Sequence, residues 1–227
     1  MHITDSTLTS CIPWDDILQP DLIAEAGEMP AILNWDGKHP LARTWSFWYF
    51  DPEIKGENLG SADSGWEQSI VKIGTFSTIE DFWSYIRYIK PISMMKTRCD
   101  ICLFKGGIQP KWEDPANRSG ARWALNFDKN TPTTMVDTHW LNLMMDLIGE
   151  NLGEFGEIVT GAIVNKRERN NRVGVWINTT DLRDPRVDGL GRKIKENLEI
   201  PPGFEIQLQS HELLAKYPGG KSIIHKI

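Results

Sequence analysis

One loop in the middle of the chain places an aromatic ring beside carboxylates. Trp112 is followed at once by Glu113 and Asp114. The surrounding stretch, Lys105 to Trp123, is interrupted by glycines and prolines, which predicts non-repetitive backbone. A glutamate there can accept two parallel hydrogen bonds from the donor-bearing edge of a planar base. The alternative is an ordinary loop tryptophan that half covers the core.

Two further tryptophans and a cationic turn could serve the same ligand. Trp66 follows a long glycine-containing segment and Trp176 falls in a strand-like segment, where a core does not require an indole. The cations near one turn are Lys166, Arg167, Arg169 and Arg172, with one acid, Glu168, among them. Such a local cluster suits a few phosphates. The alternative is a solvated hairpin tip.

Together these side chains describe a flat, positively charged ligand that carries phosphates. Two indole faces can sandwich a cationic ring, with stacking of about 1–3 kcal/mol per base and cation–π attraction in addition. A neighbouring carboxylate supplies the edge contact, and arginines neutralise the phosphates. Methylation at N7 makes guanine cationic. The residues therefore predict a purine nucleotide site, and its most specific form is a site for the methylated mRNA cap.

Composition limits the classes of protein that fit. The 227 residues, 40% of them hydrophobic, suit one domain with one core. Cys11, Cys99 and Cys102 cannot form a disulfide framework, and we find no signal peptide or long apolar run, so we expect a soluble protein of the cytosol or nucleus without membrane contact. A net charge of -6 argues against general affinity for a phosphate backbone. Ten tryptophans exceed what one core needs.

The elements that must position these residues can be read from periodicity. Residues 1–34 lack a period and predict a flexible N-terminal arm before a single domain over 35–227. His39 to Phe50 predicts a strand that is apolar on both faces, and Asp51 to Gly65 predicts a mobile loop that leads to Trp66.

The clearest helix is expected over Ser77 to Ile89, opened by a capping box that begins at Ser77. Its inward stripe leaves Ile79 and Trp83, four residues apart, on a half-exposed flank. Further helices are expected over Asp137 to Gly149 and from Asp184 onward, and further strands over Cys99–Phe104, Arg122–Phe127, Ile158–Asn165, Arg172–Asn178 and Phe204–Leu208. Because helices and strands do not alternate regularly, we expect an α+β domain on an antiparallel sheet.

Other chemistry has weaker support. Cys99 and Cys102 have metal-ligand spacing, but no second pair completes a site, so two strand cysteines are the better interpretation and no metal or cofactor is expected. Glu113 and Asp114 could form an acid/base couple in a nucleotide hydrolase. No nucleophile or metal motif accompanies them, so we expect no catalytic residue and no enzyme.

Several sequence blocks resemble one known family. They are HPL before Trp45 and Trp48, TIEDFW at 78–83, LFKGGIQPKWED at 103–114, GARW at 120–123, WLNLMMDLIGE at 140–150 and GAIVNKR at 161–167. In this order, from about His39 to the end, they resemble the cap-binding translation initiation factor 4E family.

The resemblance implies a fold and a site. The fold would be a curved antiparallel sheet of about eight strands with three helices on its convex face. Trp66 and Trp112 would stack on the base, Glu113 would read the guanine edge, Trp176 would contact the N7 methyl, and the phosphate cations would be Arg167, Arg169, Arg172 and Arg122.

The resemblance also implies a protein partner. A surface on the back of the sheet would bind an initiation scaffold factor, or a 4E-binding protein, through a YxxxxLΦ helix. Its residues would be His39, Pro40, Leu41, Ile79, Trp83, Leu141, Met145 and Gly149. By itself the protein would be a monomer acting in translation initiation. The stretch GWEQSIVKIGTF, which begins at Gly65, is closer to the repressor-like 4E homologous proteins, so a repressor is the open alternative.

Overall fold

A computed structural model describes residue 17 and residues 37–54, 69–217 and 222–227. Within these residues, eight strands form one sheet in the order β2-β1-β3-β5-β6-β4-β7-β8, and the paired neighbours run antiparallel. The strands are β1 Pro40–Phe50, β2 Ile70–Thr78, β3 Asp100–Lys105, β4 Ala121–Phe127, β5 Val159–Asn165, β6 Asn171–Ile177, β7 Gln207–Ser210 and β8 Ile223–Lys226. The expected antiparallel α+β fold is therefore confirmed.

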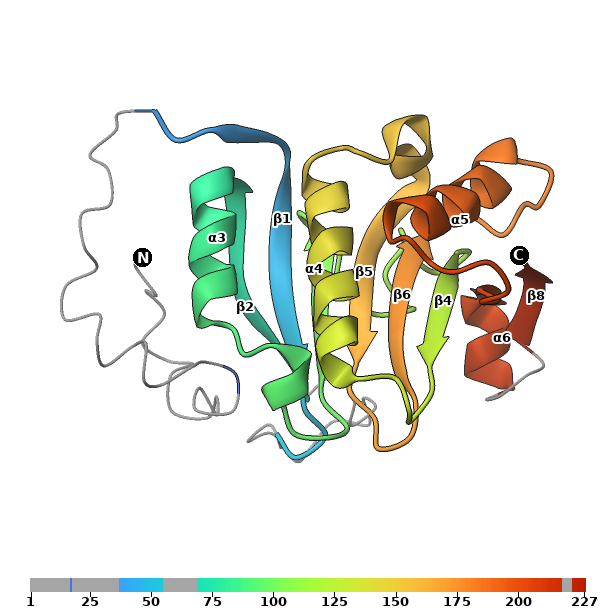
Figure 1. The fold of residues 1–227 in the computed structure, drawn as a ribbon. Coiled ribbons are helices and arrows are strands. Elements are labelled where there is room, and N and C mark those ends of the chain that lie inside the picture. Colours follow the sequence, from blue (N-terminus) through green and yellow to red (C-terminus); the bar gives the residue numbers. More distant parts are fainter. Residues whose placement is uncertain (1–16, 18–36, 55–68, 218–221) are drawn as a thin grey trace, which may run out of the picture.

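Helices α3 Ile79–Tyr88, α4 Thr133–Ile148 and α5 Pro185–Asn197 cover one face of this sheet (Figure 1). The short α6 His211–Lys216 packs beside β7, and the 3-10 turns are η2 Ile92–Met94 and η3 Gly153–Ile158. Alternate strand residues point toward the helices and form the main core, as Trp45, Phe47 and Tyr49 of β1 do. The residues between them face the uncovered side.

Helix α3 begins one residue later than its capping box predicted. The N-cap is Thr78, whose Oγ1 accepts from the backbone N–H of Asp81 at 3.2 Å and donates to the Asp81 carboxylate at 2.7 Å. Ser77 belongs to β2 instead. The box was wrongly placed because Thr78 and Asp81 repeat the pattern of Ser77 and Glu80, and only the strand pairing of β2 distinguishes them.

Whether Thr78 or Ser77 caps α3 can be tested by measuring the free energy of unfolding of two variants. Thr78→Ala removes a side chain that satisfies an orphan N–H, so we expect the free energy of unfolding to fall by about 1 kcal/mol. Ser77→Ala is the matched control and should change it by less than half as much. Urea denaturation of both variants measures this, and an equal or larger effect of the Ser77 substitution would restore the original placement.

Other boundaries also differ from the expectation. Helix α4 begins at Thr133 rather than Asp137, since Pro132 at its N-cap fits the start of a helix. Strand β7 covers Gln207–Ser210 rather than Phe204–Leu208, because its residues pair with β4. Strands β2 and β8 and helix α6 were not predicted. The helix opened by Asp184 is confirmed: its carboxylate accepts from the N–H of Arg186 at 2.9 Å.

One residue of the expected N-terminal arm is part of the core. Ile17 is fully buried, and its carbonyl accepts from the backbone N–H of Lys90 at 2.8 Å. The rest of the arm, and the part of the expected loop from residue 55 onward, lie outside the described residues. In the residues that the structure covers, no helix has the length and apolar character required to cross a bilayer.

Candidate functional site

Strand register brings three rows of side chains onto the uncovered face of the sheet. The first row is polar and crosses β3, β5, β6 and β4 through Asp100, Asn165, Arg172 and Asn126. The second row is small or aliphatic: Cys102, Ile163, Gly174 and Ala124. The third row contains the larger groups Phe104, Trp176, Arg122 and Gln209, with Gly161 between Phe104 and Trp176. The face therefore changes from ionic to aromatic along the strands.

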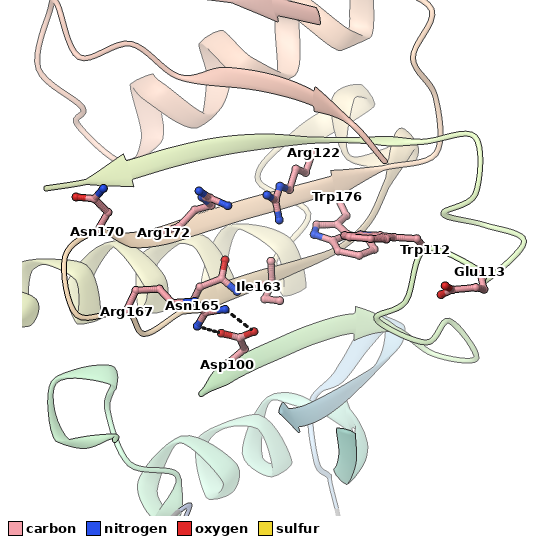
Figure 2. Close-up of a pocket in the computed structure, with 10 residues that line it drawn as sticks. All are labelled: Asp100, Trp112, Glu113, Arg122, Ile163, Asn165, Arg167, Asn170, Arg172 and Trp176. Carbon is pink, nitrogen blue, oxygen red and sulfur yellow. Dashed lines mark hydrogen bonds and ion pairs between the residues drawn. The ribbon is translucent and has the colours of Figure 1, made fainter. Parts of the chain in front are cut away.

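A cavity of about 430 Å³ opens on this face (Figure 2). This volume suits a small-molecule ligand. Figure 2 shows Arg172 and Arg167 toward one end and Trp112 and Trp176 toward the other. The lining residues are Asp100, Trp112, Glu113, Arg122, Ile163, Asn165, Arg167, Asn170, Arg172 and Trp176.

Each of the three arginines in the cavity is held by a neighbouring acceptor. Arg167 forms a bidentate pair with Asp100, at 2.5 and 3.2 Å. The Nε of Arg172 donates to Asn126 Oδ1 at 2.7 Å, and the Nε of Arg122 donates to Gln209 Oε1 at 2.9 Å. Guanidinium groups fixed in this way keep their remaining donors in defined directions.

The electrostatics around these three arginines favour a bound anion. Burial, and then the charge of Arg172, lower the pKa of Arg122 to about 9, and burial followed by the charge of Arg167 lowers the pKa of Arg172. Burial raises the pKa of the Asp100 carboxyl, while Arg167 opposes that shift. Arg122 and Arg172 stay protonated at neutral pH but repel each other in a partly desolvated site. A phosphate placed among them would relieve this repulsion.

Trp176 forms the floor of the aromatic end. It is buried, and its ring meets Phe104 edge to face with the centroids 5.4 Å apart. This packing requires glycine at position 161, where an added Cβ would lie 2.4 Å from the Phe104 ring. Trp112 projects from the loop between β3 and β4 and is 36% exposed. An indole that is this open can accept a ligand on its face.

The Trp112 loop is organised by two side chains beside it. Asp114 accepts from the backbone N–H groups of Gln109 and Ala116, one with each carboxylate oxygen and each at 2.9 Å. Asn117 donates its side-chain amide to two carbonyls of the same loop. Glu113 is exposed, and within the described residues no group bonds its carboxylate. Asp114 therefore builds the loop, whereas Glu113 is available to a ligand.

Six of the eight side chains expected to bind a nucleotide line this cavity: Trp112, Glu113, Trp176, Arg122, Arg167 and Arg172. Arg169 is exposed near the β5–β6 turn and does not line the cavity. Trp66 lies outside the described residues. Four further lining residues were not predicted from the sequence: Asp100, Ile163, Asn165 and Asn170. Alternation along β3 and β5 indicates which residues face the uncovered side, but it does not indicate which of them lie together in the cavity.

This chain is similar to known proteins in sequence. The family model described as "Eukaryotic initiation factor 4E" matches residues 40–223. The chain belongs to this family. Translation initiation factor 4E of Aplysia californica is 37% identical over 174 residues, 77% of each chain.

Solved members of the family have the same fold. Initiation factor 4E-3 of Ascaris suum, solved with an m2,2,7G cap, superposes with a TM-score of 0.73 at 32% identity, covering 84% of this chain and 99% of its own. The 4E-3 protein of Caenorhabditis elegans, in complex with the 4E-binding protein Mextli and a cap analog, superposes with a TM-score of 0.70 at 31% identity, covering 80% and 98%.

The residues expected to bind a family partner lie on the helical side of the sheet. Ile79 and Trp83 of α3 are 41% and 45% exposed, as their spacing predicted. The start of β1 is fixed to α3, since the backbone N–H of Ile79 donates to the carbonyl of His39 at 3.0 Å and His39 Nδ1 lies 2.7 Å from Glu80 Oε1. The other members are Pro40 and Gly149, which are exposed, and Leu41, Leu141 and Met145, which are half-buried against the core.

The cysteine spacing has a structural explanation. Cys99 and Cys102 are buried thiols beside and within β3, and the hydroxyl of Tyr49 donates to Cys99 Sγ at 3.0 Å. Burial raises the pKa of both thiols, that of Cys99 to about 11. Cys11 lies outside the described residues. Among the described residues, no group of three His, Cys, Asp or Glu side chains is placed to hold a metal.

Proposed function

We propose that this protein binds the 7-methylguanosine 5′ cap of mRNA on the uncovered face of its sheet and docks a helical partner on the opposite side, acting in translation initiation. One observation carries the proposal: the exposed indole of Trp112, with the available carboxylate of Glu113 beside it, lines the same cavity as three arginines. The family members solved with cap and with a 4E-binding protein support it.

The aromatic end would recognise the base. Trp112 stacks on one face of the guanine, and Trp66, by family resemblance, would close on the other. The positive charge that methylation places on the ring is attracted to indole faces, with about 2 kcal/mol or more when desolvated. Trp176, at the floor, would contact the methyl group. Glu113 would accept hydrogen bonds from the guanine edge, as carboxylates do from paired donors.

The three arginines of the cavity would bind the phosphates. Arg122, Arg167 and Arg172 line one cavity, and their fixed positions suit a short phosphate chain better than a long nucleic-acid strand. The net charge of -6 agrees with this division, because a local cluster can hold the cap while the rest of the surface repels a polyanion.

Selectivity for the methylated ring is the first test. Titration with 7-methyl-GTP should quench the indole fluorescence at much lower ligand concentration than titration with GTP. Both nucleotides share edge and phosphate contacts, so the ratio of the two dissociation constants isolates the cation-selective stacking. Equal affinities would contradict the proposal.

The helical side of the sheet would bind a YxxxxLΦ helix, which would place the apolar residues of one of its faces against this surface. We expect Trp83→Ala to weaken binding of such a peptide at least tenfold, on the order of a hot-spot tryptophan, and to leave 7-methyl-GTP affinity unchanged. Met135→Ala, which removes an exposed side chain on the first turn of α4, is the matched control. Loss of both activities in the Trp83 variant would instead identify a core residue.

A repressor-type cap binder is the alternative role. It is favoured by the stretch beginning at Gly65, which resembles the 4E homologous proteins. The two roles differ in the partner, because an initiator must assemble with the scaffold factor. Binding of a YxxxxLΦ peptide from an initiation scaffold, measured with the cap site saturated, would favour initiation, and failure to bind it would favour repression.

A nucleotide hydrolase remains the proposal from another class, and the loop geometry argues against it. Both oxygens of Asp114 accept backbone N–H groups, so Glu113 lacks a second free carboxylate with which to share acid and base roles. We expect no turnover of GTP or capped RNA on prolonged incubation. Measurable release of product by the wild-type protein, abolished by Glu113→Gln, would overturn this assignment.

A further inference from the structure

A buried histidine connects the two tryptophans of the cavity. His211 is the first residue of α6, directly after β7, and is 1% exposed. Its ring lies against Trp176, with centroids 4.2 Å apart at an interplanar angle of 47°. His211 Nδ1 also lies 2.9 Å from the backbone carbonyl oxygen of Asn117. The ring thus bridges the floor of the cavity and the loop between β3 and β4.

The residue that His211 contacts is the one that shapes the Trp112 loop. Asn117 is fully buried, and its amide donates to the carbonyl of Gln109 at 2.9 Å and to the carbonyl of Lys111 at 3.0 Å. Lys111 is the direct neighbour of Trp112. A continuous series of contacts therefore runs from Trp176 through His211 and Asn117 to the backbone that carries Trp112.

The bond to a carbonyl fixes the proton on this ring. A carbonyl only accepts, so Nδ1 must carry the hydrogen. Burial lowers the pKa of His211 to about 4, with the charge of Arg122 acting in the same direction, so the ring is neutral at physiological pH. Its Nε2 is buried and, within the described residues, has no partner. A neutral ring adds no positive charge behind Trp176 that would oppose a cationic base in front of it.

Two of the proposed phosphate contacts are held independently of this histidine. Arg167 is fixed by Asp100 and Arg172 by Asn126, on β3 and β4. Phosphate contacts should therefore survive a change at position 211. The relative placement of the two indoles should change, and attraction between a cation and a ring depends on the orientation of the ring.

We propose that His211 is a positioning residue for methyl recognition, which holds the Trp112 loop in register with Trp176 through its hydrogen bond to Asn117. This inference rests on the proposed cap-binding function. It assigns selectivity between methylated and unmethylated guanine partly to a side chain that touches neither the base nor the phosphates.

Two amide substitutions separate the hydrogen bond from the bulk of the ring. His211→Asn can place its amide nitrogen near the position of Nδ1 and donate to Asn117, whereas His211→Gln places its amide one atom further out. For both variants and the wild type, dissociation constants for GTP and 7-methyl-GTP are measured on the same sample. The ratio of the two constants does not depend on the fraction of protein that is folded.

The Gln variant should lose about fivefold in this ratio, the scale of one hydrogen bond, mainly through weaker binding of 7-methyl-GTP. The Asn variant should stay within about twofold of the wild type. His139→Gln is the control, because His139 is also buried and stacks on Phe127 in the main core, away from the cavity lining. If His211→Gln does not fold, His211→Phe, which keeps the ring volume and lacks the donor, replaces it.

An unchanged ratio in the Gln variant, equal losses for both nucleotides, or a larger loss in Asn than in Gln would each overturn the inference. Those results would leave the proposed function intact if the wild type still prefers 7-methyl-GTP. A wild-type protein without that preference would overturn the proposed function itself, and the inference with it.

Discussion

Glu113→Ala should lower the affinity for 7-methyl-GTP on the order of 100-fold. A hydrogen bond to a charged group contributes about 1.5–3 kcal/mol, and each 1.4 kcal/mol is a factor of ten in affinity. The substitution removes the acceptor for two guanine donors and leaves them unpaired beside the Trp112 ring. Because GTP presents the same edge, its affinity should fall by a similar factor. Fluorescence titration with both nucleotides measures the change.

A matched substitution distinguishes the edge contact from a general charge effect. Glu154 is an exposed glutamate on η3 that does not line the cavity, so Glu154→Ala should leave both affinities unchanged. An intermediate affinity is expected for Glu113→Gln, which keeps one acceptor oxygen but not the charge. Cap affinity that is unaffected by Glu113→Ala would show that this carboxylate does not read the base.

Trp112→Ala should have a second large effect with a different signature. Loss of stacking is worth about 1–3 kcal/mol, and the cation–π part adds to it only for the methylated base. We therefore expect 7-methyl-GTP affinity to fall at least tenfold and the preference over GTP to shrink at the same time. Trp112→Phe should recover part of the affinity for 7-methyl-GTP and part of the preference over GTP, since it restores an aromatic face.

Trp83→Ala is the natural control for this experiment. Trp83 is exposed to a similar degree as Trp112 but lies on the helical side of the sheet, so its removal tests whether any exposed indole matters. Its nucleotide affinities should match the wild type. If Trp112→Ala retained full preference for the methylated base, the indole of Trp112 would not be part of the recognition surface.

The parts of the site that were predicted from sequence are those whose signals are local. Trp112 and Glu113 are adjacent in a loop broken by glycine and proline, and the arginines cluster around one turn. Asp100 and Asn165 were missed because they meet only through the register of β3 and β5, which joins residues 65 positions apart (165 minus 100). Gln209, which holds Arg122, and His211, which bonds the carbonyl of Asn117, are 87 and 94 positions from these partners.

The fold was predictable where periodicity is strong. The two apolar faces of β1 and the flank of Ile79 and Trp83 follow directly from side-chain spacing. Strand β8 is four residues long and α6 six, too short to carry a period of their own, and pairing with β7 defines β8. The capping position of α3 depended on where β2 ends, which is a property of the sheet and not of the capping sequence.

The most direct test of cap binding is a crystal structure of the protein with 7-methyl-GTP. We expect the base stacked on Trp112, its donor edge on Glu113, its methyl group toward Trp176, and its phosphates among Arg122, Arg167 and Arg172. A nucleotide bound elsewhere, or bound in this cavity with its base away from Trp112 and Glu113, would contradict the proposal.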